Sequence, residues 1–210
     1  LLRGWWAAYR LGRRERPAVL FVTGGYASVP VALAAWMLQV PILVYLPDIE
    51  PGLAVRFAAC LARRVAVTVP ESRRFFQGRN VIVTGYPVRT EFGSLERAAC
   101  RAALGLAPED FLLVVIGGST GARGINRVLC DLLEEVLRLV RVVHLCGERD
   151  WGWVAKRAEA LPTALSARYR VAPYMHAEEL GPVLAAADLA LCRAGAMTLG
   201  ELPFFGLPAI

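Results

Sequence analysis

The chain alternates between short apolar runs and longer stretches in which apolar residues recur at helical spacing. The first series of apolar runs covers 18–23, 42–46, 65–69 and 81–84. Such runs, rich in valine, leucine and isoleucine, are typical of strands in a parallel sheet. The stretches between them predict helices over 29–39 and 53–63.

The same rhythm restarts after a break around Gly85–Arg89 and a predicted helix over 94–104. The strands predicted in this second series are 111–116, 141–146, 168–172 and 188–192. The helices predicted to alternate with them are 124–139, 150–160, 177–187 and 196–205. Alternating strands and helices build parallel sheets with helices on both faces, so we expect an α/β protein. The expected parts are a first domain over 1–88, a linker over 89–107 and a second domain over 108–210.

Composition and charge narrow the possible partners. The hydrophobic content of 56% and the mean hydropathy of +0.45 are high for a soluble protein and leave room for a membrane-facing surface. Residues 1–92 carry 12 basic and 5 acidic side chains, so this half is expected to meet an anionic partner such as lipid head groups or a diphosphate. No basic motif with interleaved aromatic residues is present, and nucleic acid is therefore not an expected partner.

Cysteine and histidine usage argues against a metal site. The five cysteines are scattered without a CxxC pair, which favours reduced, buried thiols. Of the two histidines, His144 lies inside an apolar run and is interpreted as a core residue.

Glycine-rich turns follow three predicted strands, at Gly24–Tyr26, Gly117–Gly121 and Arg193–Gly195. In open parallel sheets, ligands bind beyond the carboxyl ends of the strands. The turn at 117–121 lacks the lysine of a Walker A loop and does not fit GxGxxG, which disfavours ATP hydrolysis and ordinary dinucleotide binding. A tight strand–helix turn remains the structural alternative.

The third turn opens a predicted helix with Thr198 and Glu201 near its start. A helix start presents unpaired N–H groups and partial positive charge, so it suits a diphosphate. Glu201 is a poor phosphate ligand, but its carboxylate can accept hydrogen bonds from a pair of sugar hydroxyls. This segment therefore predicts a nucleotide-diphosphate site with a ribose contact.

Three charged residues have two interpretations each. Arg89, at the break, and Arg193, at a strand end, are either solvated arginines or cations that neutralise a diphosphate. Asp48 follows the strand 42–46 in a turn-forming segment, where it either shapes the turn or acts on an attacking hydroxyl as a base or positioning group.

The first helix combines aromatic and basic residues. Trp5, Trp6 and the more distant Trp36 accompany Arg3 and Arg10 in the basic half of the chain. These tryptophans are either core residues or part of a bilayer interface, where rings lie at head-group level and guanidinium groups meet phosphates. The local basic excess favours the membrane-facing interpretation.

Together these stretches resemble the MurG family of glycosyltransferases. The matching segments, in chain order, are Gly24–Ser28, Ala34–Trp36, Pro51–Leu53, Gly85–Arg89, Gly117–Arg123, Gly147–Arg149 and Cys192–Thr198 with Glu201. The resemblance implies a GT-B fold, in which two Rossmann-like parallel-sheet domains face a cleft, with both domains incomplete in this chain. It also implies inverting transfer of N-acetylglucosamine from UDP-N-acetylglucosamine to lipid I, a polyprenyl-diphosphate-linked sugar, without a cofactor or metal. The expected location is the cytoplasmic face of the bacterial cell membrane, as a peripheral protein on an anionic surface.

The resemblance also implies which residues bind each substrate. The donor-binding set would be Arg89, Gly118, Ser119, Met175, Arg193, Gly195, Ala196, Thr198 and Glu201, with the Met175 backbone beside the uracil. The acceptor would meet Gly24, Gly25, Tyr26 and Ser28, with Asp48 positioning it. The family's histidine-bearing loop, a favoured source of the catalytic base, is expected before Leu1, and the glutamines that contact the donor sugar are expected after Ile210.

One departure keeps other functions open. The family's His-Glu-Gln-Asn segment is Tyr45–Asp48 here. A transferase acting on another lipid such as diacylglycerol, a UDP-N-acetylglucosamine epimerase of the same architecture, and a non-catalytic nucleotide-sugar binder are the alternatives.

Overall fold

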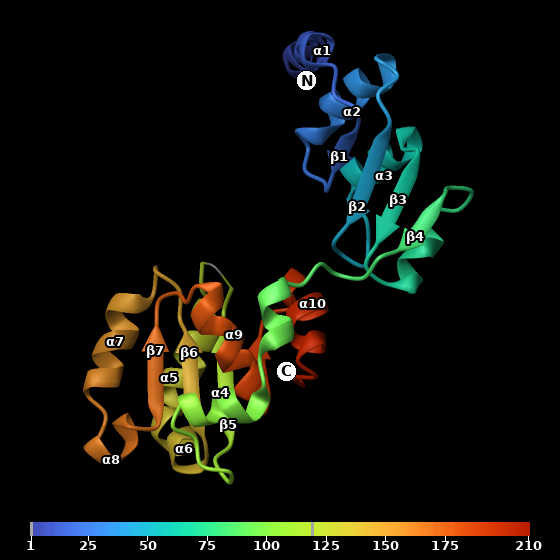
Figure 1. The fold of residues 1–210 in the computed structure, drawn as a ribbon. Helices are drawn as coiled ribbons and strands as arrows, with labels where there is room; N and C mark the ends of the chain where they lie inside the picture. Colours follow the sequence, from blue (N-terminus) through green and yellow to red (C-terminus); the bar gives the residue numbers. More distant parts are fainter. Residues whose placement is uncertain (1, 119) are drawn as a thin grey trace. The chain divides into compact units, whose positions relative to one another are not determined.

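The computed structural model describes residues 2–118 and 120–210, with no side chain described over 196–199. The chain divides into two compact units, Leu1–Tyr86 and Pro87–Ile210 (Figure 1). Each unit contains a four-stranded sheet in which every described strand pairing is parallel. The predicted α/β class with two parallel sheets is therefore confirmed.

The first unit is built on a sheet with the strand order β1-β2-β3-β4. Its strands are β1 (Leu20–Val22), β2 (Ile42–Leu46), β3 (Arg64–Val67) and β4 (Val81–Val83). Helices α2 (Ser28–Met37) and α3 (Leu53–Leu61) cover one face, where the small side chains of Ala32 and Ala58 allow a close approach to the strands. Helix α1 (Leu2–Glu15) packs on α2, and a 3-10 helix, η1 (Pro70–Phe75), follows β3.

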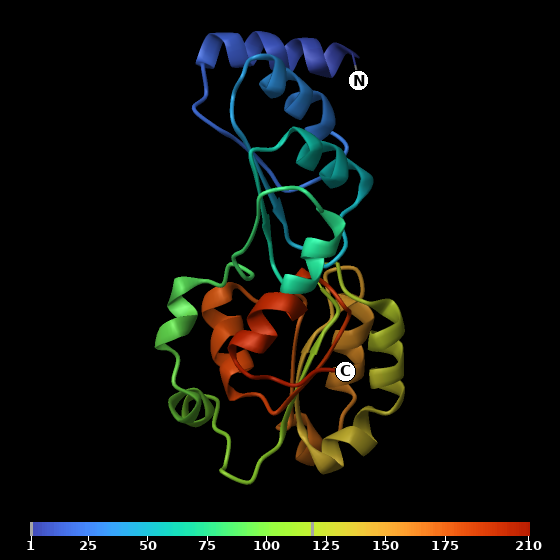
Figure 2. The same cartoon turned by 90° about the vertical axis from the view of Figure 1, so that its right-hand side faces the viewer.

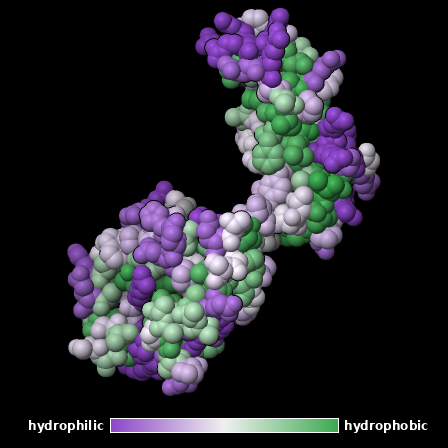
Figure 3. Space-filling model, viewed as in Figure 1, coloured by the Kyte–Doolittle hydropathy of each residue, from purple (hydrophilic) through white to green (hydrophobic). Residues whose placement is uncertain are grey.

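The second face of this sheet is open, which corrects the expectation of helices on both faces. In β2, Val44 is fully buried while its neighbour Tyr45 is only half-buried. Phe21 of β1 stacks beside Tyr45 and is 57% exposed. Figure 3 shows a hydrophobic area over β1 and β2 on this face. Apolar residues on both sides of a strand predict that both faces of the sheet are covered. They do not show whether a helix of this chain supplies the cover.

The second unit has the strand order β7-β6-β5-β8. Its strands are β5 (Leu112–Ile116), β6 (Arg141–Leu145), β7 (Tyr169–Ala172) and β8 (Leu189–Cys192). Its helices are α4 (Arg97–Ala103), α5 (Arg123–Asp131), α6 (Leu133–Leu139), α7 (Trp151–Glu159), α8 (Thr163–Ser166), α9 (Ala177–Ala186) and α10 (Ala196–Phe204). Helices lie on both faces of this sheet, as predicted (Figure 2). Val114 shares a core with Leu184 of α9 on one face, and the adjacent Val115 shares a core with Leu129 of α5 on the other.

Residues 89–107, predicted as a linker, instead fold onto the second unit. They form the 3-10 helix η2 (Thr90–Ser94) and α4. From α4, Arg97 and Arg101 both pair with Asp188, at N···O distances of 2.6 and 3.2 Å. The same carboxylate accepts a hydrogen bond from the Leu112 backbone, so it joins α4 to the start of β5. This pairing of residues far apart in sequence could not be read from the local pattern.

The remaining differences between the predicted and the observed elements are small. The single helix predicted over 124–139 is two helices, α5 and α6, that meet at Leu132. The short helices η1, η2 and α8 were not predicted. Over the described residues, none of the helices has the length and apolar character needed to cross a membrane.

Candidate functional site

The predicted donor-binding residues gather at one edge of the second unit. Gly118 follows β5, Met175 follows β7, and Arg193 and Gly195 follow β8. Because the four strands are parallel, these positions share the carboxyl edge of the sheet. Helices α5, α9 and α10 begin at the same edge, so their free N–H groups face the region where the turns lie.

The turn after β5 is built by glycine contacts. Gly121 has a φ of +78° and Gly147, after β6, has a φ of +84°. The two backbones touch: a Cβ added to Gly147 would lie 2.5 Å from the Gly121 Cα, and one added to Gly121 would overlap the Cys146 carbonyl. Gly118 has a φ of +86° and nothing lies within 4 Å of an added Cβ, while its carbonyl accepts a hydrogen bond from the Gly121 N–H at 3.0 Å. Ser119 lies outside the described residues.

Arg89 and Glu201, a residue in the middle of α10, face each other. The Arg89 Nε lies 4.0 Å from a Glu201 carboxylate oxygen. The Glu201 side chain is only 17% exposed, and burial raises its pKa, an effect that the Arg89 guanidinium opposes. A shielded carboxylate beside one cation is suited to accept hydrogen bonds from hydroxyl groups. Sequence reasoning singled out both residues, and the structure brings them together.

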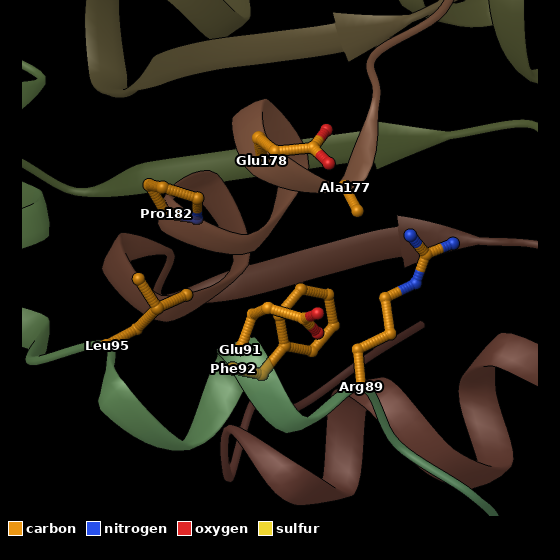
Figure 4. A pocket seen from close by; sticks show the side chains of 7 residues that line it. All are labelled: Arg89, Glu91, Phe92, Leu95, Ala177, Glu178 and Pro182. Carbon is orange, nitrogen blue, oxygen red and sulfur yellow. The ribbon is translucent and has the colours of Figure 1, made fainter.

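A cavity of about 260 Å³ adjoins this pair. Figure 4 shows the seven side chains that line it, which are Arg89, Glu91, Phe92, Leu95, Ala177, Glu178 and Pro182. Its walls combine an aromatic ring and aliphatic carbons with charged groups, a composition that fits a flat, partly polar ligand group. Phe92 is held in place by Gly181 of α9, where an added Cβ would lie 2.8 Å from the ring.

The other predicted donor residues have different surroundings. Met175 is only 2% exposed, and its side chain belongs to the core at the carboxyl edge of the sheet. Arg193 is exposed beyond β8. Gly195 is the extended N-cap of α10, while Ala196 and Thr198 begin the helix with side chains outside those described.

In the first unit, the predicted acceptor residues also lie at the carboxyl edge of the sheet. Gly24 and Gly25 have φ values of +126° and +83°, and the Ser28 hydroxyl donates to the Gly25 carbonyl at 2.7 Å. Tyr26 is 80% exposed. Asp48 is exposed in the loop after β2. These residues therefore share one edge of the sheet.

Two buried hydroxyls that the sequence did not single out fix the Asp48 loop. Thr68, directly after β3, donates to the Leu46 carbonyl at 2.7 Å. Ser72 of η1 is fully buried and donates to the Ile49 carbonyl at 2.7 Å. A hydroxyl residue immediately after a buried strand was the available signal for this role.

The predicted membrane-facing residues divide into two groups. Trp6, Trp36, Arg3 and Arg10 are exposed. Trp5 is half-buried and, with Leu2 of α1 and Val29, Pro30, Leu33 and Met37 of α2, lines an apolar pocket of about 370 Å³. In the region that the structure describes, no cluster of three or more His, Cys, Asp or Glu side chains could hold a metal ion.

The chain is similar in sequence to glycosyltransferases. Residues 112–210 match the glycosyltransferase family 28 C-terminal domain. The chain is 44% identical to a Roseiflexus sp. protein and 38% identical to a Moorella thermoacetica protein, matching along 100% and 99% of its own length. Both relatives are named UDP-N-acetylglucosamine–N-acetylmuramyl-(pentapeptide) pyrophosphoryl-undecaprenol N-acetylglucosamine transferase. The chain spans about half the length of these curated relatives, 55% and 57%.

The chain is also similar in fold to solved structures. The chain is similar to Acinetobacter baumannii MurG, with a TM-score of 0.74 and 25% identity over 99% of this chain and 56% of that one. It is also similar in fold to the UDP-GlcNAc 2-epimerase from Neisseria meningitidis, with a TM-score of 0.68 over 99% of this chain and 62% of that one. The identity to the epimerase is 13%, so that likeness concerns the fold alone.

Proposed function

Because the chain belongs to the MurG family of glycosyltransferases, we propose that the full-length protein transfers N-acetylglucosamine from UDP-N-acetylglucosamine to lipid I. The product would be lipid II, for peptidoglycan synthesis. The observation that carries the proposal is the Arg89–Glu201 pair beside the glycine turns and helix starts of the second unit. The names of the sequence relatives support the same reaction.

The donor would bind along the carboxyl edge of the second sheet. Glu201 would accept hydrogen bonds from the ribose hydroxyls, and the cavity beside Arg89 would receive the uracil. The Gly118 backbone and the first N–H groups of α10 would face the diphosphate. This arrangement uses hydrogen-bond acceptors for the sugar and donors for the phosphates, as the charges require.

The chemical step would be an inverting displacement. A hydroxyl of the acceptor sugar would attack C1 of the donor sugar while a general base takes its proton, the C1–O bond to the diphosphate would break, and UDP would depart with the bonding electrons. The helix-start N–H groups, with Arg193 and Arg89, would stabilise the charge that develops on the leaving diphosphate. We propose no metal for this step, because these groups supply the positive potential.

The acceptor would meet the first unit at Gly24–Ser28, where positive φ values leave backbone groups open to a diphosphate. Asp48, on a loop held by Thr68 and Ser72, would position the attacking hydroxyl. Assays with lipid I and with diacylglycerol as acceptors separate this proposal from a transferase acting on another lipid. The epimerase alternative has support from fold alone and is not proposed.

The ribose assignment has a direct test. Glu201→Ala in the full-length protein is expected to weaken UDP-N-acetylglucosamine binding about tenfold to hundredfold, because hydrogen bonds to a charged acceptor are lost. Isothermal titration calorimetry measures the change. Glu109→Ala is the control, because Glu109 is exposed and precedes β5 at the opposite edge of the sheet. Unchanged affinity in Glu201→Ala would contradict the assignment.

We also propose that α1 holds the protein on the cytoplasmic face of the cell membrane. Its exposed side combines Trp6 with Arg3 and Arg10, which can meet head groups and phosphates. The apolar pocket between α1 and α2 offers further contact with lipid chains. Figure 3 shows the hydrophilic surface of α1 next to hydrophobic surface of the same unit.

This membrane contact predicts a specific loss. The double variant Trp6→Ser/Arg10→Glu is expected to bind phosphatidylglycerol vesicles at least about tenfold more weakly, because it removes one ring that would insert into the lipid and one cation that would meet the head groups. Co-sedimentation measures binding, with phosphatidylcholine vesicles as the neutral comparison. Arg127→Glu, an equal charge reversal at an exposed site on α5, should bind like the unsubstituted protein. Equal binding by the double variant would exclude α1 as the contact.

A further inference from the structure

A chain of buried polar side chains runs beneath the glycine turn of the second unit. His144 of β6 and Asn126 of α5 are fully buried, and Asp150 is 3% exposed. His144 Nδ1 lies 2.7 Å from the Tyr169 hydroxyl, and His144 Nε2 lies 2.9 Å from Asn126 Oδ1. The Asn126 amide reaches Asp150 at 2.9 Å, and Arg123 Nε reaches the same carboxylate at 3.0 Å. Five side chains, two from α5 and one each from β6, β7 and the N-cap of α7, thus form one network.

The partners determine where each proton lies. The Asn126 amide nitrogen contacts the Cys146 carbonyl and the Asp150 carboxylate, and both groups can only accept. Asn126 Oδ1 must therefore accept a hydrogen from His144 Nε2. His144 Nδ1 is then the acceptor for the Tyr169 hydroxyl, and the imidazole is neutral. The hydrogen bonds from Tyr169 through His144 and Asn126 to Asp150 therefore all run in one direction, and Arg123 donates to Asp150 from the other end.

The negative charge of Asp150, at the end of the network opposite Tyr169, is balanced by hydrogen bonds and an ion pair. Burial raises the pKa of Asp150, but hydrogen bonds from Trp153, Asn126 and Arg123 outweigh it, so the pKa lies below its ordinary value. Arg123, the first residue of α5, is 61% exposed at its side chain and also pairs with Asp150 at 2.9 Å. The carboxylate thus ties the start of α5 to the start of α7.

The network acts on the backbone of the turn. The Asn126 amide holds the Cys146 carbonyl at 2.7 Å, and this carbonyl is the group that Gly121 packs against. Gly147, the next residue, also packs against the Gly121 backbone. The side chains of α5 and β6 therefore fix the surface on which the turn rests.

A core built for stability alone would not need these groups. Apolar side chains of similar size often stabilise a fold as well as a buried polar network does, whereas a fully satisfied network fixes one geometry. We propose that the Tyr169–His144–Asn126–Asp150 network positions the donor-binding turn, with Asn126 and His144 as positioning residues that hold Gly121 and Arg123 in the conformation that receives the diphosphate. This inference rests on the proposed function for its ligand, and on the contacts alone for its effect on the turn.

The test compares two core substitutions in the full-length protein. His144→Phe keeps an aromatic ring and removes both hydrogen bonds, whereas Leu137→Ala opens the apolar cluster at α6, which borders the network at Tyr169 and leaves its hydrogen-bonding groups in place. Hydrogen–deuterium exchange of the amides at 120–123 and 146–150 reports on the turn, and calorimetry with UDP as the probe reports on binding. Donor KM and kcat are measured for both variants at lipid I saturation.

The network predicts a local effect. His144→Phe should speed exchange at both turn segments and raise the UDP Kd and donor KM at least about tenfold, with a smaller change in kcat. Tyr169→Phe, which removes only the outermost hydrogen bond, should give a smaller change of the same kind.

Two results would overturn the inference. One is turn exchange and UDP affinity that stay unchanged in His144→Phe. The other is Leu137→Ala producing the same turn exchange and the same Kd as His144→Phe at equal loss of stability, which would make the network an ordinary part of the core. If the unsubstituted protein does not bind UDP while turn exchange still depends on His144, the proposed function fails and the positioning of the turn stands.

Discussion

Gly121→Ala is expected to lower the free energy of unfolding of the second unit by about 3 kcal/mol and to abolish UDP binding. The φ of +78° costs an alanine roughly 1–2 kcal/mol. The added Cβ would also overlap the Cys146 carbonyl, and relief of such overpacking costs roughly 1–3 kcal/mol. Because this carbonyl is held by Asn126, it cannot move without breaking the buried network.

Gly118→Ala separates the two contributions. Gly118 has a similar φ of +86°, but nothing lies within 4 Å of an added Cβ. Its expected cost is therefore about 1 kcal/mol, from backbone strain alone. Native-state hydrogen exchange of the β5 and β6 amides measures the free energy of unfolding of the second unit in both variants. Equal losses in the free energy of unfolding for Gly121→Ala and Gly118→Ala would show that the contact between the turn and the Cys146 carbonyl does not contribute to stability.

The positions of the elements were predictable because local pattern determines them. The run Leu112–Ile116 is apolar at every position, since both faces of β5 are covered by helices, and this predicts a parallel strand. A glycine turn after such a strand likewise predicts a ligand-binding edge, which is where Gly118 and Gly195 lie. The positions of the strands and of the glycine turns at their ends thus followed from short stretches of sequence.

Pairings between distant residues were not predictable in this way. Arg89 and Glu201 are each visible as candidates, but their separation of 4.0 Å depends on η2 folding onto the second unit. That folding in turn depends on Arg97 and Arg101 finding Asp188. Charged residues in a helical segment carry no local sign of their partner, so the segment resembles a linker.

The hydrogen bonds of the buried network were likewise not predictable from the sequence. His144 was interpreted as a core histidine, and its complete burial confirms this. Asn126 received no interpretation, because one amide residue on a helix has no periodic signal that separates a buried position from an exposed one. The role of both residues depends on the Cys146 carbonyl and the Asp150 carboxylate, which the fold brings to them.

The buried His144 predicts that the second unit loses stability in mild acid. Burial lowers the pKa of His144 from 6.5 to about 4, so between these values the unfolded chain binds a proton that the folded chain does not. Stability is therefore full above pH 6.5 and falls by about 1.4 kcal/mol per pH unit toward pH 4, about 3 kcal/mol in all. Urea denaturation of the full-length protein across this range measures the loss.

His144→Phe is the matched control for this slope, because it removes the titrating group and keeps the ring. The difference between the two proteins isolates His144: the raised pKa of Glu201 gives a slope of opposite sign, but it is present in both. The lowered pKa values of Asp110 and Asp150 act below pH 3.8, outside this window. The unsubstituted protein should lose about 3 kcal/mol more than His144→Phe between pH 6.5 and 4. Parallel pH profiles would mean that His144 accepts a proton inside the fold, and the neutral imidazole required by the Tyr169 and Asn126 hydrogen bonds would be wrong.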